Sequence, residues 1–73
     1  MNDNNEVVMK LIKLKDVMDI TGLGRSTIYK YITEATFPKP VSLGKKSVAW
    51  VESEVEEWIM ERIEERDSNL LPL

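Results

Sequence analysis

The chain has 73 residues, a net charge of −3, and neither cysteine nor histidine. Its length predicts one small domain of marginal stability. The missing cysteines exclude disulfides and thiolate metal sites, and without histidine the commonest general base and metal ligand are absent. No apolar run approaches the roughly 18 to 20 residues that span a bilayer, and the polar, acidic N-terminus is unlike a secretory signal. We therefore expect a cytoplasmic protein without membrane contact, and no cofactor.

Charge is distributed unevenly along the chain. Between Thr21 and Trp50 five cations accompany one carboxylate, a balance of +4, whereas from Val51 onward eight carboxylates accompany two arginines, a balance of −6. A polyanion is steered by the local field and not by the total charge. The net negative charge is therefore compatible with nucleic acid as a partner, because the basic middle and the acidic end can form opposite faces.

The first predicted elements are short. Residues 1–8 are polar and aperiodic, which predicts a flexible N-terminal arm. The alternation of apolar residues and lysines over 9–14 fits either a small strand or an extended lead-in. A short helix is expected over residues 15–20, with Asp16 near its start and Gly22 ending it in a left-handed conformation. Its apolar side would consist of Val17, Met18 and Ile20.

A second helix is predicted from about Arg25 to Ala35, with Gly24 as a tolerable N-cap. Leu23, in the turn between the helices, would pack against both and fix their angle. Apolar residues at i, i+3, i+4 and i+7 predict one buried stripe, made of Ile28, Tyr31, Ile32 and Ala35. The opposite face is basic and rich in hydroxyl groups: it holds Ser26, Thr27, Lys30 and Thr33, with Tyr29 at its margin.

The segment Phe37-Pro38-Lys39-Pro40 ends the helical region, because a proline biases the preceding residue to extended structure. Two short alternating runs then predict a β-hairpin, with Gly44-Lys45-Lys46-Ser47 as its doubly basic tip. The apolar positions of these runs are Val41, Leu43, Val48 and Trp50.

The last predicted element is a helix from Ser53 to about Arg66. Ser53 and Glu56 match the capping box, in which a serine and a glutamate three residues later satisfy free N–H groups. The buried face would be formed by Val55, Trp58, Ile59 and Ile63, and the outer face by Glu57, Glu61 and Glu65. Residues 67–73 are predicted to form a flexible C-terminal tail.

The order helix, turn, helix, hairpin, helix predicts a mainly α fold with a small β-hairpin, a winged helix-turn-helix over residues 9–66. In such a domain the second helix enters the major groove of DNA. Its outward residues Ser26, Thr27 and Lys30 would read base edges. Five residues would contact the DNA backbone: Arg25, Tyr29, Lys45, Lys46 and Ser47. We predict no catalytic residue and no enzymatic activity.

Each assignment has an alternative. Arg25 and Lys30 also suit a solvated helix face, and lysines at a hairpin tip also protect strand edges. Ser26 and Lys30 have the spacing of a serine–lysine nucleophile pair, but the sequence offers no orienting acid. Trp50 and Trp58 fall on apolar stripes and are assigned to the core. A second class of function is a protein-interaction module, in which a partner docks on the acidic helix Ser53–Arg66 and on the leucines of the tail, Leu70, Leu71 and Leu73.

Three segments in combination, T-G-L-G-R-S-T-I-Y (21–29), F-P-K-P (37–40) and V-A-W-V-E-S-E-V-E-E-W-I (48–59), resemble the AlpA family of small phage-type regulators. The resemblance spans about Leu11 to Arg66. It implies a compact winged-helix domain similar to the MerR and excisionase folds. In the family the recognition helix corresponds to Arg25, Ser26, Thr27, Tyr29 and Lys30 here, and the wing to Lys45, Lys46 and Ser47. Gly24 stands where the family usually has a serine cap, at a cost of only a few tenths of a kcal/mol.

The resemblance also implies a function. It is that of a sequence-specific DNA-binding protein of a prophage or genomic island. Such a protein acts as an excisionase (a recombination directionality factor), as a transcriptional regulator of the integrase gene, or as both. The implied partner is double-stranded DNA. Two further partners are open, namely the cognate integrase and other copies of the chain bound to DNA.

Overall fold

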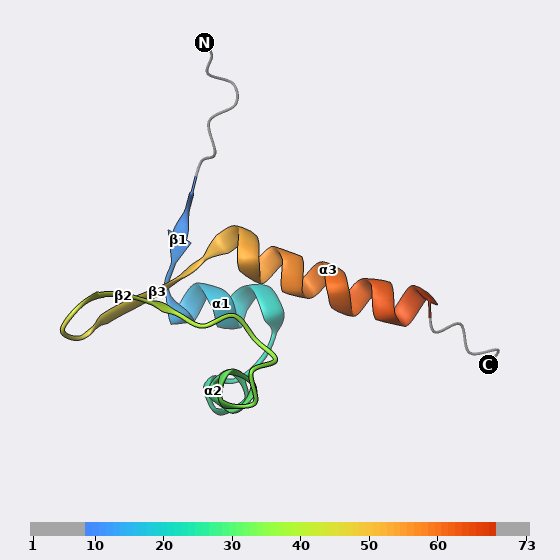
Figure 1. Ribbon diagram of the computed structural model, residues 1–73, viewed down its shortest axis with the longest axis horizontal. Coiled ribbons are helices and arrows are strands. Elements are labelled where there is room, and N and C mark those ends of the chain that lie inside the picture. Colours follow the sequence, from blue (N-terminus) through green and yellow to red (C-terminus); the bar gives the residue numbers. More distant parts are fainter. Residues whose placement is uncertain (1–8, 69–73) are drawn as a thin grey trace, which may run out of the picture.

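A small sheet and two short helices surround the core, and a long third helix extends away from them (Figure 1). The computed structural model describes residues 9–68, so the predicted N-terminal arm and residues 69–73 of the predicted tail lie outside the described residues. The elements are, in chain order, β1 (Leu11–Ile12), α1 (Leu14–Thr21), α2 (Arg25–Thr33), β2 (Val41–Gly44), β3 (Ser47–Val51) and α3 (Glu52–Ser68). This order confirms the predicted fold class, three helices with a β-hairpin.

β3 is the central strand of an antiparallel sheet with the order β1-β3-β2. Ile12 lies opposite Trp50, and Val41 lies opposite Ala49. The sequence allowed either a small strand or an extended lead-in over residues 9–14. The structure has a two-residue strand there. Because β1 pairs with β3 and continues into α1, it ties the base of the hairpin to the first helix.

The core draws on all three helices and on two of the strands. Its buried residues are Ile12, Val17, Ile28, Phe37, Trp50 and Val55, with Leu23, Tyr31 and Trp58 among the partly buried residues packed against them. Trp50 is fully buried, and its Nε1–H donates to the Pro38 carbonyl at 3.0 Å. Trp58 lies edge-on to Phe37 with ring centroids 4.9 Å apart, and its Nε1–H donates to the Thr36 carbonyl. Both tryptophans and Leu23 thus have the packing role that the sequence predicted.

The turn between α1 and α2 has the predicted chemistry. Gly22 has φ of 76°, and its N–H donates to the Met18 carbonyl at 2.8 Å, which ends α1 in a left-handed cap. The Asp16 carboxylate accepts the Lys13 N–H at 3.2 Å and so closes the other end of the helix. One detail of α1 was wrong: Ile20 is 43% exposed and is not part of the core cluster.

α2 is shorter than predicted. It ends at Thr33, and Ala35 is exposed with φ of 62°, so Ala35 does not extend the buried stripe. A local turn and one tertiary contact end the helix: the Thr36 N–H and hydroxyl both donate to the Tyr31 carbonyl, at 2.8 and 3.1 Å, and Trp58 on α3 binds the Thr36 carbonyl. These contacts hold the chain in a left-handed turn that brings Phe37 into the core.

The predicted capping box of the last helix was also wrong. α3 begins at Glu52, immediately after β3, so Ser53 lies inside the first turn and does not cap it. The Glu52 N–H donates instead to the Lys10 carbonyl at 2.8 Å. A strand can therefore run directly into this helix, because backbone next to β1 supplies the missing acceptor. The helix also continues to Ser68, two residues past its predicted end.

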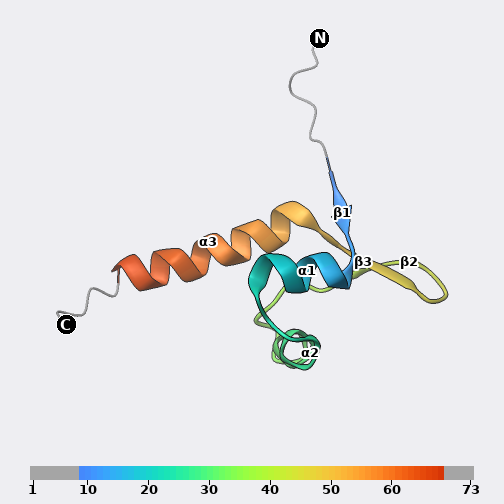
Figure 2. The same cartoon turned by 180° about the vertical axis from the view of Figure 1, so that it is seen from behind.

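The hairpin of β2 and β3 projects from the body of the molecule as a wing (Figures 1 and 2). All four residues of β2 are exposed, Leu43 by 50%, and so is Val48 on β3. Only Ala49 and Trp50, at the base of β3, are buried. The alternating apolar residues of the hairpin therefore predicted its strands correctly, but of the four only Trp50 is buried.

Two substitutions in the turns test the left-handed residues. Ala35→Gly should stabilise the protein by about 0.5 kcal/mol, because an L-residue in this region costs about 1–2 kcal/mol and glycine costs part of that in unfolded-state entropy. Gly22→Ala should destabilise it by about 1 kcal/mol. No heavy atom lies within 4 Å of a Cβ built at Gly22, so the cost is conformational and not steric. Urea unfolding followed by far-UV circular dichroism measures both, and equal signs for the two changes would contradict this account.

Candidate nucleic-acid interface

The N-terminal half of α2 presents an open helix start to solvent. Gly24 is the N-cap and offers no side chain, so no side-chain hydrogen bond closes this end. Arg25 and Ser26 are exposed in the first turn, Thr27 is half-buried, and Lys30 is exposed one turn later. Free N–H groups and the positive end of the helix dipole favour a phosphate here. Ser26 and Lys30 are four residues apart and so lie on one face of the helix.

Tyr29 links this helix to the wing. Its ring meets Trp50 edge-to-face, with centroids 6.3 Å apart and an interplanar angle of 68°. The side chain is nevertheless 41% exposed. Because Trp50 belongs to β3, this aromatic contact fixes the spacing between the exposed face of α2 and the base of the wing. Tyr29 therefore has a packing role in addition to its predicted contact with the DNA backbone.

The tip of the wing holds two exposed lysines, Lys45 and Lys46, in the turn between β2 and β3. Ser47 follows them and is half-buried, since its hydroxyl oxygen accepts a hydrogen bond from Lys13 Nζ at 3.0 Å. The Ser47 proton remains able to donate to an acceptor such as a phosphate oxygen. A third cation, Lys13, thus stands beside the wing.

Sequence reasoning missed Lys13. In the sequence, Lys10, Lys13 and Lys15 stand out only as polar residues between apolar ones. Lys13 reaches the wing because β1 pairs with β3, and a two-residue strand carries no periodic signal that would place it. The residue pair Lys13 and Ser47 is separated by 34 positions, so local patterns could not have joined it.

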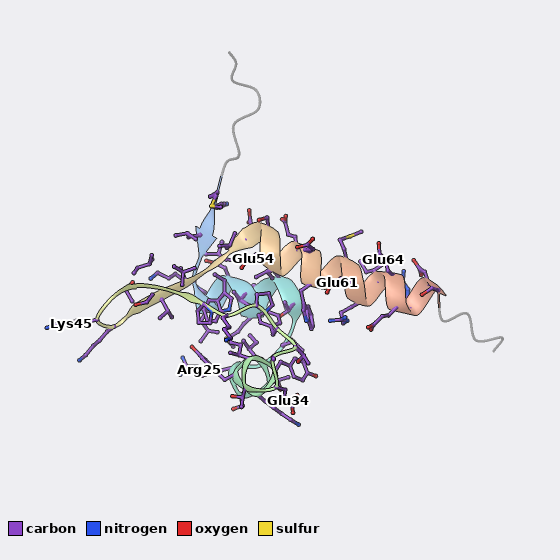
Figure 3. All side chains as sticks on the ribbon, in the orientation of Figure 1. Arg25, Glu34, Lys45, Glu54, Glu61 and Glu64 are labelled. Atoms are coloured by element: carbon purple, nitrogen blue, oxygen red, sulfur yellow. The ribbon has the colours of Figure 1, made fainter. Side chains whose placement is uncertain are left out.

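Charged side chains are distributed unevenly over the molecule. In Figure 3, Lys45 lies at the tip of the wing and Arg25 beside α2, whereas Glu61 and Glu64 lie along α3, which extends away from the wing. Glu34 lies at the other end of α2, and Glu54 lies in the first turn of α3. Figure 2 shows the same divergence of wing and α3 from behind. The lysine-tipped wing and the C-terminal part of α3 therefore carry opposite charges at separate places, while carboxylates also lie at the end of α2 and at the start of α3.

Acidic side chains of α3 are only partly neutralised. Arg62 pairs with Glu65 at 3.1 Å, and its guanidinium lies over the Trp58 ring at 4.9 Å from the centroid. Arg66 pairs with Asp67 at 2.9 Å, and this hydrogen bond and the carboxylate charge raise the pKa of Arg66 above its ordinary value. Two arginines cannot balance the eight carboxylates of this part of the chain. The helix therefore repels a polyanion and would face away from one.

Other kinds of site have little support in the described structure. Within residues 9–68 no group of three or more acidic side chains is arranged to hold a metal ion, and no helix has the length and apolarity to cross a bilayer. A hollow of about 790 Å³ lies between α3 and the segment after α2, and neither Ser26 nor Lys30 lines it. That hollow therefore gives no support to a serine–lysine nucleophile pair on α2.

A helix-turn-helix pair followed by a β-hairpin defines a winged helix-like domain, here with a basic second helix and a basic wing tip. The chain belongs to the family of the prophage CP4-57 regulatory protein AlpA, whose model matches residues 10–63. The resemblance seen in the sequence is thereby confirmed.

Two relatives illustrate the family. The DNA-binding transcriptional activator AlpA of Escherichia coli (strain K12) is 40% identical over 65 residues, which cover 81% of this chain and 93% of that protein. The uncharacterized protein ORF88 of Enterobacteria phage P4 is 48% identical over 54 residues, 74% of this chain and 61% of that protein. The matched lengths show that the similarity covers most of the described domain.

Proposed function

We propose that this protein is a sequence-specific DNA-binding regulator of a prophage or genomic island. The observation that carries the proposal is that the open, basic start of α2 and the lysine-tipped wing are both exposed to solvent, while Glu61 and Glu64 lie along α3, which extends away from the wing. A duplex that approaches these two elements meets a helix of the right size for the major groove and a cationic hairpin beside it. The name of the 40% identical relative supports the same function.

In this proposal Ser26, Thr27 and Lys30 read base edges in the major groove. Lysine suits the acceptors of guanine, and hydroxyl groups can serve several bases. Arg25 and Tyr29 hold phosphates at either side of the helix start. Lys45, Lys46 and Ser47 contact the backbone from the wing, which supplies affinity without base choice.

Within the mobile element, we propose two roles that use the same contacts, excision and transcriptional control of the integrase gene. They differ in where the DNA site lies. DNase I footprinting across the attachment site and the integrase promoter of the host element separates them. Protection of the promoter alone would exclude the excisionase role, and protection of the attachment site alone would exclude direct control of that gene.

The wing gives a direct test of DNA binding. Replacing Lys45 and Lys46 together by alanine should weaken binding to all duplexes, because two phosphate contacts are lost, and should reduce the salt slope of log K by about 1.8. Fluorescence anisotropy with a labelled duplex between 50 and 200 mM salt measures both quantities. The paired change should leave base preference unaltered, since phosphate contacts carry no sequence information. Unchanged binding to every duplex would remove the wing from the interface.

A second candidate function is partner docking on α3. The observation in its favour is a hollow of about 350 Å³ between α1, the turn after it and α3, with an apolar lining that includes Ile20, Leu23, Ile59 and Ile63. The leucines of the tail, which this hypothesis also used, lie outside the described residues. If a chain shortened to residues 1–66 still captures the cognate integrase as well as the full chain does, the tail has no part in docking.

A further inference from the structure

The wing is weakly held by the rest of the protein. Every residue of β2 is exposed, and the turn Lys45–Lys46 is exposed as well. The hairpin is irregular near its tip, where the register shifts between Ser42 and Gly44. A two-stranded hairpin without a covered face is only marginally stable in water. Some contact beyond the ladder is therefore needed if the tip is to keep one direction.

The backbone of β1 does not reach far enough to provide that contact. Its pairing with β3 covers only Trp50 and Val51, at the base of the wing, because the chain turns into α1 at Leu14. Lys13 is the last residue before this turn. Beyond Trp50, toward the tip, β3 has no backbone partner on this side among residues 9–68.

The Lys13 side chain continues where β1 stops. Its Nζ donates to the Ser47 hydroxyl at 3.0 Å and approaches the Val48 carbonyl at 3.4 Å. Lys13 is at the same time the N-cap residue of α1, and its own N–H is held by Asp16 at 3.2 Å. One residue thus joins the start of the helix pair to the outer part of the wing.

We propose that Lys13 is a positioning residue that tethers the wing to the N-terminus of α1 and so directs Lys45 and Lys46 toward the DNA backbone. A charged donor makes stronger hydrogen bonds than a neutral one, which suits a single side chain bridging two elements. The proposal deepens the proposed DNA binding and rests on it for its functional part. Its structural part, the tether, can be tested without DNA.

The first experiment measures the motion of the wing in the full chain. In Lys13→Met, which keeps the aliphatic length and loses the ammonium group, the backbone amide order parameters of Gly44 to Ser47 should fall from about 0.85 toward 0.6. Lys15→Met is the matched control, since Lys15 is an exposed lysine on α1 with no side-chain hydrogen bond or ion pair among residues 9–68. Lys13→Arg retains a charged donor and should restore the order. Unchanged order parameters in Lys13→Met would overturn the tether.

The second experiment measures duplex binding and its salt slope in the same variants. If Lys13 acts through the wing, Lys13→Met should weaken DNA binding and reduce the salt slope of log K when the wing is wild-type. The same change should alter neither quantity in a chain whose Lys45 and Lys46 are already replaced by alanine. A loss that persists in that double-alanine background, with a slope lower by about 0.9, would make Lys13 a phosphate contact of its own and overturn the positioning role. The positioning role would also be overturned if Lys13→Met lost affinity only in proportion to the fraction of unfolded protein, with the salt slope unchanged.

The two experiments separate this inference from the proposed function. If the wild-type chain fails to bind any duplex, DNA binding is wrong, yet the order parameters still decide whether Lys13 holds the wing. If the wild-type chain binds and Lys13→Met binds equally well with the same slope, DNA binding stands and the positioning role is wrong.

Discussion

Trp50→Ala should remove about 3–5 kcal/mol of the protein's stability and lower its urea midpoint strongly. Trp50 is fully buried at the centre of the sheet, donates to the Pro38 carbonyl, and supports the ring of Tyr29. Removing a buried tryptophan side chain costs about 3–5 kcal/mol. A domain of this size has a total stability of about 4–11 kcal/mol, at roughly 0.05–0.15 kcal/mol per residue, so the loss is a large part of it. Urea unfolding monitored by far-UV circular dichroism gives the midpoint and the free energy.

Leu43→Ala is the matched control for that change. Leu43 belongs to the same hairpin and is also large and apolar, but it is half exposed on β2 and makes no part of the core cluster. Surface substitutions of this kind change stability by about 0.5 kcal/mol or less. A Trp50→Ala midpoint close to that of Leu43→Ala would mean that the hairpin base is not the centre of the fold.

Lys30→Ala is expected to reduce the preference for the specific DNA site. A lysine that bonds a base edge contributes about 1–3 kcal/mol of discrimination, which is a five- to more than hundredfold loss of affinity for the preferred site. Binding to a scrambled duplex should fall much less, since the helix start and the wing retain their phosphate contacts. Competition between the labelled specific site and the unlabelled scrambled duplex measures the ratio directly.

Lys15→Ala is the control for this second change, because Lys15 is an exposed lysine of α1 and has no assigned contact with DNA. It removes the same charge from the neighbouring helix. Equal losses on specific and scrambled duplexes in Lys30→Ala would make Lys30 a phosphate contact, and the base-reading face of α2 would then have to be sought elsewhere on the helix.

Local features of the sequence predicted much of α2 and the hairpin. The 3.6-residue spacing of Ile28, Tyr31 and Ile32 identifies the face of α2 that packs inward, and the opposite face is then open to solvent. Gly22 marks the end of α1, since glycine adopts the left-handed conformation without strain. The prolines after α2 and the alternation around Lys45 and Lys46 predict the hairpin. The roles of individual side chains toward DNA remain predictions.

Other predicted details failed because part of their cause is distant in the chain. The capping box at Ser53 was wrong since the Lys10 carbonyl, 42 positions earlier, accepts the Glu52 N–H. Ala35 leaves the helix in a left-handed turn that Thr36 closes locally on the Tyr31 carbonyl, and Trp58 on α3 holds that turn from a distance by binding the Thr36 carbonyl. In both cases a local rule named a plausible residue, and a tertiary contact helped to place the chain differently.

The sequence by itself determined the order of the elements, the inward face of α2 and the basic character of the helix start and the wing tip, because periodicity, turn residues and charge act over a few neighbouring positions. Only the tertiary structure decided how the wing stands relative to that helix. The antiparallel pairing of β1 with β3, the contact of Tyr29 with Trp50, and the hydrogen bond from Lys13 to Ser47 join residues 21 to 40 positions apart. Contacts at such separations form when the core closes, and no local pattern encodes them.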